Sequence, residues 1–109
     1  MTTQEISQMI ESIGIPYDYY QFSEATAMPP PFICFYYSGS ADMMADNINY
    51  TKINALTIEL YTDEKDFQLE KRVEDTLIAH GIPFVREETY IDSERMYMVI
   101  FTTEVLINA

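Results

Sequence analysis

The sequence has few of the residues from which most active sites are built. It contains one cysteine, Cys34, one histidine, His80, and no tryptophan. With Cys34 in an expected strand and no second histidine, neither a cysteine–histidine pair nor the usual ligand set of a transition metal can be assembled. Cys34 lies in the apolar segment 32–37, where we expect a buried and unreactive thiol. His80 lies at the end of an expected helix, where it can cap backbone carbonyls.

Glycine and long apolar segments are also scarce. The three glycines are scattered at the ends of expected elements, so a glycine-rich phosphate loop is not predicted. No apolar segment approaches the roughly 18 residues that cross a bilayer, and the chain does not begin with a basic segment followed by an apolar one. We therefore expect no membrane association and a location in a reducing cytoplasm.

Carboxylates are plentiful, but their spacing does not predict a site. Glu87 and Glu88 are adjacent in an expected strand, so their side chains point to opposite faces and cannot simply share a proton. The segment 42–49 offers oxygen ligands, but it lacks the glycine and the terminal glutamate of a calcium loop. We therefore expect no catalytic residues, no cofactor and no bound metal, and a small enzyme is the least favoured function class.

Basic residues are few and unevenly placed. Eighteen acidic residues against six basic ones give a formal net charge of −12, and the first lysine or arginine is Lys52. Such a charge repels phosphate backbones and anionic lipids, so we expect no direct nucleic-acid binding. Two interpretations stay open for the acidic first half of the chain. It forms a solvated surface that aids solubility, or it forms a negative wall or a site for a basic partner.

The residues that are present suffice for one packed domain. The 109 residues are 48% hydrophobic and include nine tyrosines and six phenylalanines. This length fits a single domain spanning residues 1–109. An amphipathic helix is predicted over residues 4–13, with Thr2 or Thr3 as its N-cap and Gly14 at its end. Its buried stripe consists of Ile6, Met9, Ile10 and Ile13.

A second helix is predicted between a cap residue and Gly81. The cap is Thr62, Asp63 or Asp66. The inward stripe of this helix consists of Leu69, Val73, Thr76 and Leu77. The side chains expected to face water are Glu70, Lys71, Glu74 and Asp75.

Strands are predicted over residues 17–22, 32–37, 54–61, 82–91 and 95–106. In 54–61, three aliphatic residues, Leu56, Ile58 and Leu60, alternate with Thr57, Glu59 and Tyr61. Segment 40–52 has no clean period and is either a long connection or a splayed hairpin arm. The order α-β-β-β-α-β-β predicts an α+β fold, in which a mostly antiparallel sheet of about five strands carries two helices on one face.

The other face of the sheet is predicted to be apolar. The alternation places on it Tyr61, Met96, Met98 and Ile100, together with Tyr19 or Tyr20. Such a face is too apolar to leave in water, which favours burial against another subunit. The alternative is a sheet that curls and buries both of its faces internally.

Short segments between about Ile15 and Val105 resemble those of one protein family. They are Pro30–Phe32, Tyr36–Tyr37, Ala45–Asn47, Tyr50–Ile53, Ile58–Asp63, Tyr90–Glu94 and Tyr97. In these segments the chain resembles small tail-terminator or tail-completion proteins of long-tailed phages and prophages of Gram-positive bacteria. Such proteins are also described as minor capsid or head–tail joining proteins. The shared segments are structural, and none is a chemical signature.

The resemblance implies a non-enzymatic virion component of the tail or neck that assembles in the cytoplasm of the bacterial host. It implies self-association, usually as a hexameric ring, on the end of the completed tail tube. The ring stops growth of the tube protein and offers a surface to the head connector proteins. This accords with an apolar sheet face, because a ring needs heterologous interfaces that close.

Two groups of residues in segment 40–52 become candidates on this hypothesis. Asp42 and Asp46 are candidate lumen charges, which would keep passing DNA from adhering to the wall of the ring. The candidate subunit contacts are Met43, Met44, Asn47 and Tyr50, in addition to those of the sheet face.

Two other functions stay open. An acidic inhibitor that mimics DNA would suit the charge and the small size, but it needs carboxylates in two phosphate-like rows. Several carboxylates, among them Glu70, Glu74 and Asp75, are instead expected on the outer face of a helix. A neck or head-completion subunit is close to the main hypothesis, and the sequence does not separate the two.

Overall fold

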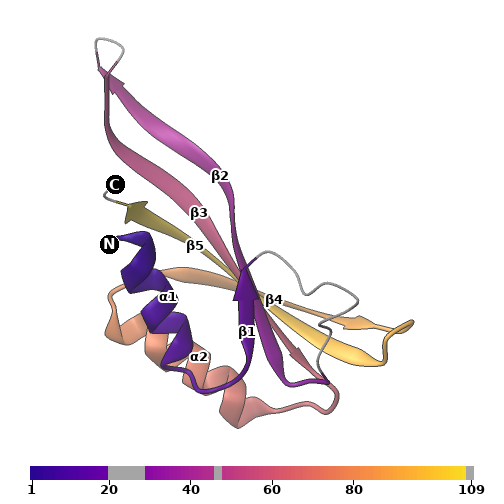
Figure 1. Cartoon of the computed structure of the whole chain (residues 1–109). Coiled ribbons are helices and arrows are strands. Elements are labelled where there is room, and N and C mark those ends of the chain that lie inside the picture. Colours follow the sequence, from indigo (N-terminus) through magenta and orange to yellow (C-terminus); the bar gives the residue numbers. More distant parts are fainter. Residues whose placement is uncertain (20–28, 46–47, 108–109) are drawn as a thin grey trace.

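The computed structural model describes residues 1–19, 29–45 and 48–107. Within these residues, two helices lie on one face of a five-stranded sheet (Figure 1). The elements are α1 (Thr3–Glu11), β1 (Tyr17–Tyr19), β2 (Phe32–Ala45), β3 (Ile48–Thr62), α2 (Phe67–Ala79), β4 (Phe84–Ile91) and β5 (Met96–Ile107). The predicted α+β class and the predicted order of elements are confirmed.

The sheet is mixed, and its strands lie in the order β1-β2-β3-β5-β4. β1 runs parallel to β2, whereas the other three pairs of neighbouring strands in the described sheet are antiparallel. β1 and β4, the strands that follow the two helices, form the two edges of the sheet. β3 is the central strand and joins the two halves.

Helix α1 begins and ends with the local signals that the sequence predicts. The Thr2 hydroxyl accepts a hydrogen bond from the Glu5 amide at 3.1 Å, and the Glu5 carboxylate accepts one from the Thr2 amide at 3.0 Å. This reciprocal pair is a capping box. Gly14 has a φ of 91°, which favours glycine and ends the helix. The predicted stripe is buried, namely Ile6, Met9, Ile10 and Ile13.

Helix α2 also has defined caps. Of the three candidate residues, Asp66 is the N-cap, and its side chain accepts a hydrogen bond from the Leu69 amide at 3.0 Å. At the other end, Nδ1 of His80 lies 2.8 Å from the carbonyl oxygen of Thr76, as expected of a capping residue. Gly81 follows with a φ of 69°. The buried residues of the predicted stripe are Leu69, Val73 and Leu77.

The prediction that Glu70 faces water is wrong. Its side chain is 1% exposed, and its carboxylate is paired with two cations from outside the helix. Lys65 Nζ lies 2.6 Å from Oε2 of Glu70, and Arg86 of β4 pairs with Oε1. A carboxylate tolerates burial here because both of its oxygens have charged partners.

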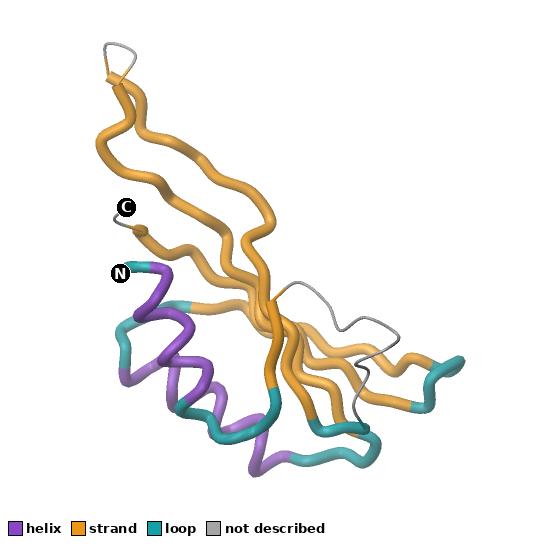
Figure 2. Tube along the Cα trace, in the orientation of Figure 1, coloured by secondary structure: helices purple, strands orange, loops and turns teal. Residues whose placement is uncertain are grey.

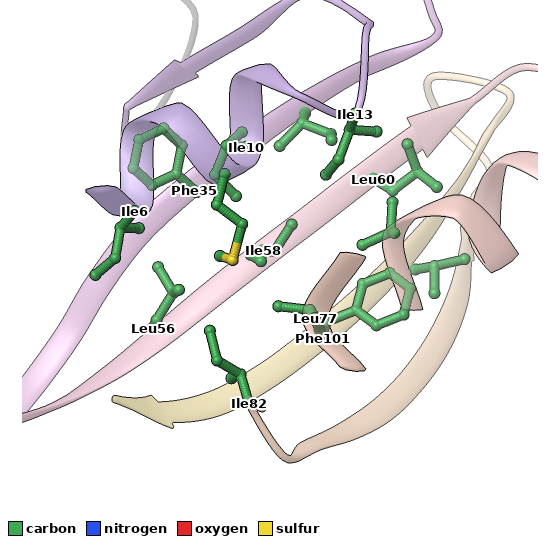
Figure 3. Close-up of a cluster of buried hydrophobic side chains, with 14 of the residues drawn as sticks. Ile6, Ile10, Ile13, Phe35, Leu56, Ile58, Leu60, Leu77, Ile82 and Phe101 are labelled. Atoms are coloured by element: carbon green, nitrogen blue, oxygen red, sulfur yellow. The ribbon is translucent and has the colours of Figure 1, made fainter. Parts of the chain in front are cut away.

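The hydrophobic core fills the space between the helices and the sheet (Figure 3). Side chains from both helices meet side chains from β2, β3 and β5 there, among them Ile6, Ile10, Phe35, Leu56, Ile58, Leu60, Leu77 and Phe101. Leu56, Ile58 and Leu60 are all fully buried, as the alternation predicts. Cys34 is buried as well, as expected.

β2 and β3 are longer than predicted and form a projecting hairpin arm. β5 accompanies β3 only as far as Lys52, which lies opposite Ile107. Beyond this point the described residues form a two-stranded ribbon that extends past the helices (Figures 1 and 2). Residues 40–45 and 48–52 therefore belong to a hairpin arm, the second of the two interpretations. Of the predicted strand 17–22, residues 20–22 lie outside the described residues.

Candidate functional site: the helix-free face of the sheet

Both helices pack on the same side of the sheet, and no described helix covers the opposite side (Figure 1). Neighbouring residues of a strand point to opposite faces, so the residues between core positions lie on this opposite side. We call it the helix-free face. Its described residues are Asp18, Phe32, Cys34, Tyr36, Thr57, Glu59, Tyr61, Val85, Glu87, Thr89, Ile91, Met96, Met98, Ile100 and Thr102.

The middle of the helix-free face is apolar and aromatic. Phe32 of β2 lies opposite Tyr61 of β3, and their rings stack with centroids 4.8 Å apart and planes at 20°. On its other side Tyr61 lies opposite Met98 of β5, while Ile100 lies opposite Glu59. These apolar side chains are partly buried, and Tyr61 has an apolar neighbour on each of the two adjacent strands.

Glu59 is the polar centre of this surface. The Tyr36 hydroxyl donates a hydrogen bond to Oε2 of Glu59 at 3.1 Å, and the Tyr61 hydroxyl donates one to Oε1 at 2.9 Å. Burial, followed by the hydrogen bond to Glu59, raises the pKa of Tyr61, so this hydroxyl stays protonated and continues to donate. The two hydroxyls hold the carboxylate in place, and each oxygen keeps capacity for a further donor.

All charged side chains among the described residues of the helix-free face are acidic: Asp18, Glu59 and Glu87. Four described cations have partners within the chain. Lys65 and Arg86 pair with Glu70, Lys71 lies 2.6 Å from Asp75, and Arg72 donates to the carbonyl oxygen of Ile13. The face therefore combines an apolar surface with negative charge.

The structure brings together the four candidates predicted for the sheet face. Tyr61, Met96, Met98 and Ile100 all lie on the helix-free face and are partly buried. Tyr19 does not share it. Its register partner is Phe35, a core residue, and the two rings meet edge to face with centroids 5.3 Å apart. Tyr20 lies outside the described residues.

The candidates of segment 40–52 lie elsewhere, in the hairpin arm. Asp42, Met43 and Met44 belong to β2 and Tyr50 belongs to β3, but their side chains are outside the described part of the structure. Asp46 and Asn47 lie outside the described residues altogether. The backbone register puts Asp42 directly opposite Lys52.

Three residues of the site were not among the sequence candidates: Phe32, Tyr36 and Glu59. The period of two already placed Glu59 on the same face as Tyr61. The contribution of Tyr36 depends on the pairing of β2 with β3, in which Tyr36 lies opposite Thr57. That register joins residues more than twenty positions apart, so no local pattern reports it.

Two surface pockets lie in the described part of the chain. One, of about 290 Å³, is apolar and is lined by Pro83, Phe84, Val85, Thr102 and Thr103. The other, of about 230 Å³, is lined by Met1, Glu5, Gln8, Met9, Ser12 and His80. In the second pocket the Ser12 hydroxyl donates to the Met9 carbonyl at 2.6 Å, and His80 contacts the Thr76 carbonyl. These bonds stabilise helix ends and do not form a nucleophile–base pair.

The described residues contain no group of three or more histidine, cysteine, aspartate or glutamate side chains that could hold a metal ion. None of the helices in that part of the chain is long and apolar enough to cross a membrane.

The chain matches no protein-family model and no curated protein. A function can therefore be inferred from the residues of the helix-free face and from the resemblance of the sequence segments.

Proposed function

We propose that the protein is a non-enzymatic phage or prophage virion component. It forms a ring on the end of the tail tube and joins the tube to the head connector proteins. It assembles in the cytoplasm of the bacterial host and remains in the tail or neck of the virion. The hexameric ring number follows from the family resemblance alone.

The observation that carries this proposal is the helix-free face. Removal of apolar surface from water contributes about 25 cal/mol per Å². A partly buried surface that includes Phe32, Tyr61, Met98 and Ile100 therefore favours association with another protein of the virion. The absence of charged side chains between these residues, apart from Glu59, matches the composition of subunit interfaces.

The hairpin arm supports the same proposal. A two-stranded ribbon is only marginally stable in water, because it has few neighbours against which to bury its side chains. Beyond Lys52 the described arm has no third strand. Contact with an adjacent subunit of a ring would supply the missing neighbour, and a ring of this kind uses a different surface on each side of every subunit.

The charge of −12 fits a protein that surrounds DNA without binding it. Asp42 and Asp46 remain the candidate lumen residues on this proposal. Reversal of both charges should slow DNA ejection from assembled virions. Unchanged ejection would remove the lumen role and leave the ring proposal intact.

An acidic DNA mimic is the alternative of a different class, and the distribution of carboxylates favours it less. Glu70 is buried in a pair with two cations, Asp75 pairs with Lys71 on the outside of α2, and Glu59 lies on the opposite side of the sheet. These positions do not form two parallel rows.

A neck or head-completion subunit is the alternative within the same class, and binding to connector alone, without tail tubes, would favour it.

The test combines native mass with imaging. Native mass is measured over a range of protein concentrations, and negative-stain images are taken after addition of purified tail tubes. We expect ring-shaped caps on tube ends. A strict monomer that caps no tubes contradicts the proposal, whereas a monomer that caps tubes supports it, because such subunits can wait for the tube before they form a ring.

A further inference from the structure

The surroundings of Glu59 have the features of a site for a cation. The carboxylate lies on a sheet face whose described charges are all negative, and its two described hydrogen bonds come from the hydroxyls of Tyr36 and Tyr61. Both hydroxyls orient the carboxylate but leave its charge in place. Phe32, stacked on Tyr61, adds a second aromatic ring beside it.

A guanidinium group suits this arrangement better than an ammonium group does. Its planar fork can donate to both oxygens of a carboxylate, and its flat face stacks on aromatic rings. Cations near tyrosine and phenylalanine rings are also attracted by the ring electrons, more strongly where water is excluded. Met98 and Ile100, on the neighbouring strand, would help to exclude water.

A second copy of this chain is a poor source of the cation. Its described cations Lys65, Lys71, Arg72 and Arg86 all have partners within the chain. Arg95, the third arginine of the chain, is exposed in the turn between β4 and β5, which also contains Asp92 and Glu94. Two copies that met through their helix-free faces would also bring one Glu59 toward the other.

We propose that Glu59, held by Tyr36 and Tyr61 beside Phe32, receives an arginine side chain from a different protein of the virion, which packs its own apolar surface on the helix-free face. This inference rests on the proposed function, because the assembling virion supplies the partner. The complementarity is between an acidic aromatic site and an arginine surrounded by apolar residues. Glu59 thus selects the partner, and the apolar residues around it supply most of the affinity.

The site can be tested without the partner by using n-butylguanidinium as the probe. Amide spectra of the ¹⁵N-labelled full chain are recorded during titration at 150 mM NaCl, with n-butylurea as the uncharged control. We expect saturable shifts at residues around Glu59 and contacts between the butyl protons and the rings of Phe32 and Tyr61. Shifts confined to the acidic outer surface of α2 would overturn the proposal.

Two variants separate the site from general negative charge. Glu59→Gln should weaken n-butylguanidinium binding at least fivefold. Glu87→Gln removes the same charge from the same face and should change it less than twofold. Equal losses for both variants would mean non-specific attraction and would overturn the proposal. If Glu59→Gln does not fold, two other measurements test the site. One is the contact of the butyl protons with the aromatic rings of Phe32 and Tyr61 in the wild-type protein. The other is n-butylguanidinium binding to Tyr61→Phe, in which one carboxylate oxygen of Glu59 is freed.

The capping assay then separates this inference from the proposed function. If wild-type protein and Glu87→Gln cap tail tubes but Glu59→Gln does not, both are supported. If all three cap tubes equally, the arginine site is wrong and the capping function stands. If wild-type protein caps no tubes and remains a monomer, the proposed function fails, and the virion partner fails with it, whatever the probe binds.

Discussion

Glu70 of α2 and Arg86 of β4 form an ion pair across the boundary between the helices and an edge strand. Glu70 is 1% exposed and Arg86 is 33% exposed, so the pair is buried at one end and open to solvent at the other. Lys65, which precedes the helix, completes the pairing of the Glu70 carboxylate. The pair fixes α2 to a part of the sheet that has a neighbouring strand on one side only.

Replacement of Glu70 by alanine should lower the free energy of unfolding by about 3 kcal/mol, because it removes the buried carboxylate between Lys65 and Arg86 and leaves them only the more exposed carboxylates of Glu74 and Glu88. The cations are partly exposed, which keeps the effect at the lower end of the range for buried pairs. Urea unfolding measures it. Asp75→Ala is the matched control, since it removes the exposed partner of Lys71 and should cost less than about 0.5 kcal/mol. Equal losses would mean that the Glu70 cluster contributes no more than a surface pair.

Stability should depend on pH through Lys65 and Glu88, which also pair with each other. Hydrogen bonding to Lys65 lowers the pKa of Glu88 below its ordinary 4.5. Burial lowers the pKa of Lys65, but hydrogen bonds to Glu70 and Glu88 outweigh it and raise the pKa above 10.5. The Glu88 contribution is therefore present above pH 4.5 and is lost as pH falls through the lowered folded value. The Lys65 contribution is present below pH 10.5 and is lost as pH rises through the raised value.

We expect the free energy of unfolding to change little between these limits and to fall on either side. Glu88→Gln should reduce the acid-side slope in urea unfolding measured from pH 6 to pH 3. Glu87→Gln, the adjacent residue on the other face, serves as the comparison. An acid-side slope that is unchanged in Glu88→Gln would contradict the assignment.

The two glycines that end the helices should respond differently to alanine. Both have positive φ, 91° for Gly14 and 69° for Gly81, so each alanine should cost about 1 kcal/mol for backbone strain. A Cβ on Gly14 would also lie 2.9 Å from Nη2 of Arg72, whereas a Cβ on Gly81 meets nothing within 4 Å. Gly14→Ala should therefore be the more destabilising, because it displaces Arg72 from the Ile13 carbonyl. Urea midpoints compare the two, and a larger loss for Gly81→Ala would refute this account.

Tyr61 should be among the last tyrosines to ionise. Burial and the hydrogen bond to Glu59 raise its pKa above the ordinary 10.0. In an alkaline titration followed at the absorbance of phenolate, Tyr61→Phe should remove a transition from the high end of the curve and leave the lower part unchanged. The same variant should lose about 1 kcal/mol of stability with the hydrogen bond. If Tyr61→Phe instead lost a transition near pH 10 relative to the wild type, the buried environment of this hydroxyl would be contradicted.

Much of the fold follows from local patterns that have one buried side. The period of two in Leu56, Ile58 and Leu60 predicts β3 because those positions pack on the helices. The arm was ambiguous because its sequence has no clean period, and the register of β2 against β3 is interrupted twice there, between Tyr37 and Ser40 and between Met43 and Met44. Glu70 was misplaced by residue type, although it shares the spacing of Val73 and Leu77 on α2. Its burial depends on Lys65 and on Arg86, and Arg86 comes from a distant strand.

The candidate site is less predictable for a similar reason. Tyr61, Met98 and Ile100 follow from alternation within single strands, but the contact of Tyr36 with Glu59 requires the register of β2 against β3. Residues 38 and 39 interrupt that register with an irregularity between Tyr37 and Ser40. Such a shift moves side chains from one face to the other and leaves no local signal.

β3 is the central strand, and its neighbouring residues face the core and the helix-free face in turn. Ile58 and Leu60 face the core, while Glu59, between them in sequence, faces the opposite side. Amide protons along this strand are shielded by β2 on one side and β5 on the other, so they should exchange with deuterium only when the sheet opens. A molecule that binds at Glu59 should therefore slow deuterium uptake at Ile58 and Leu60, although it touches neither side chain.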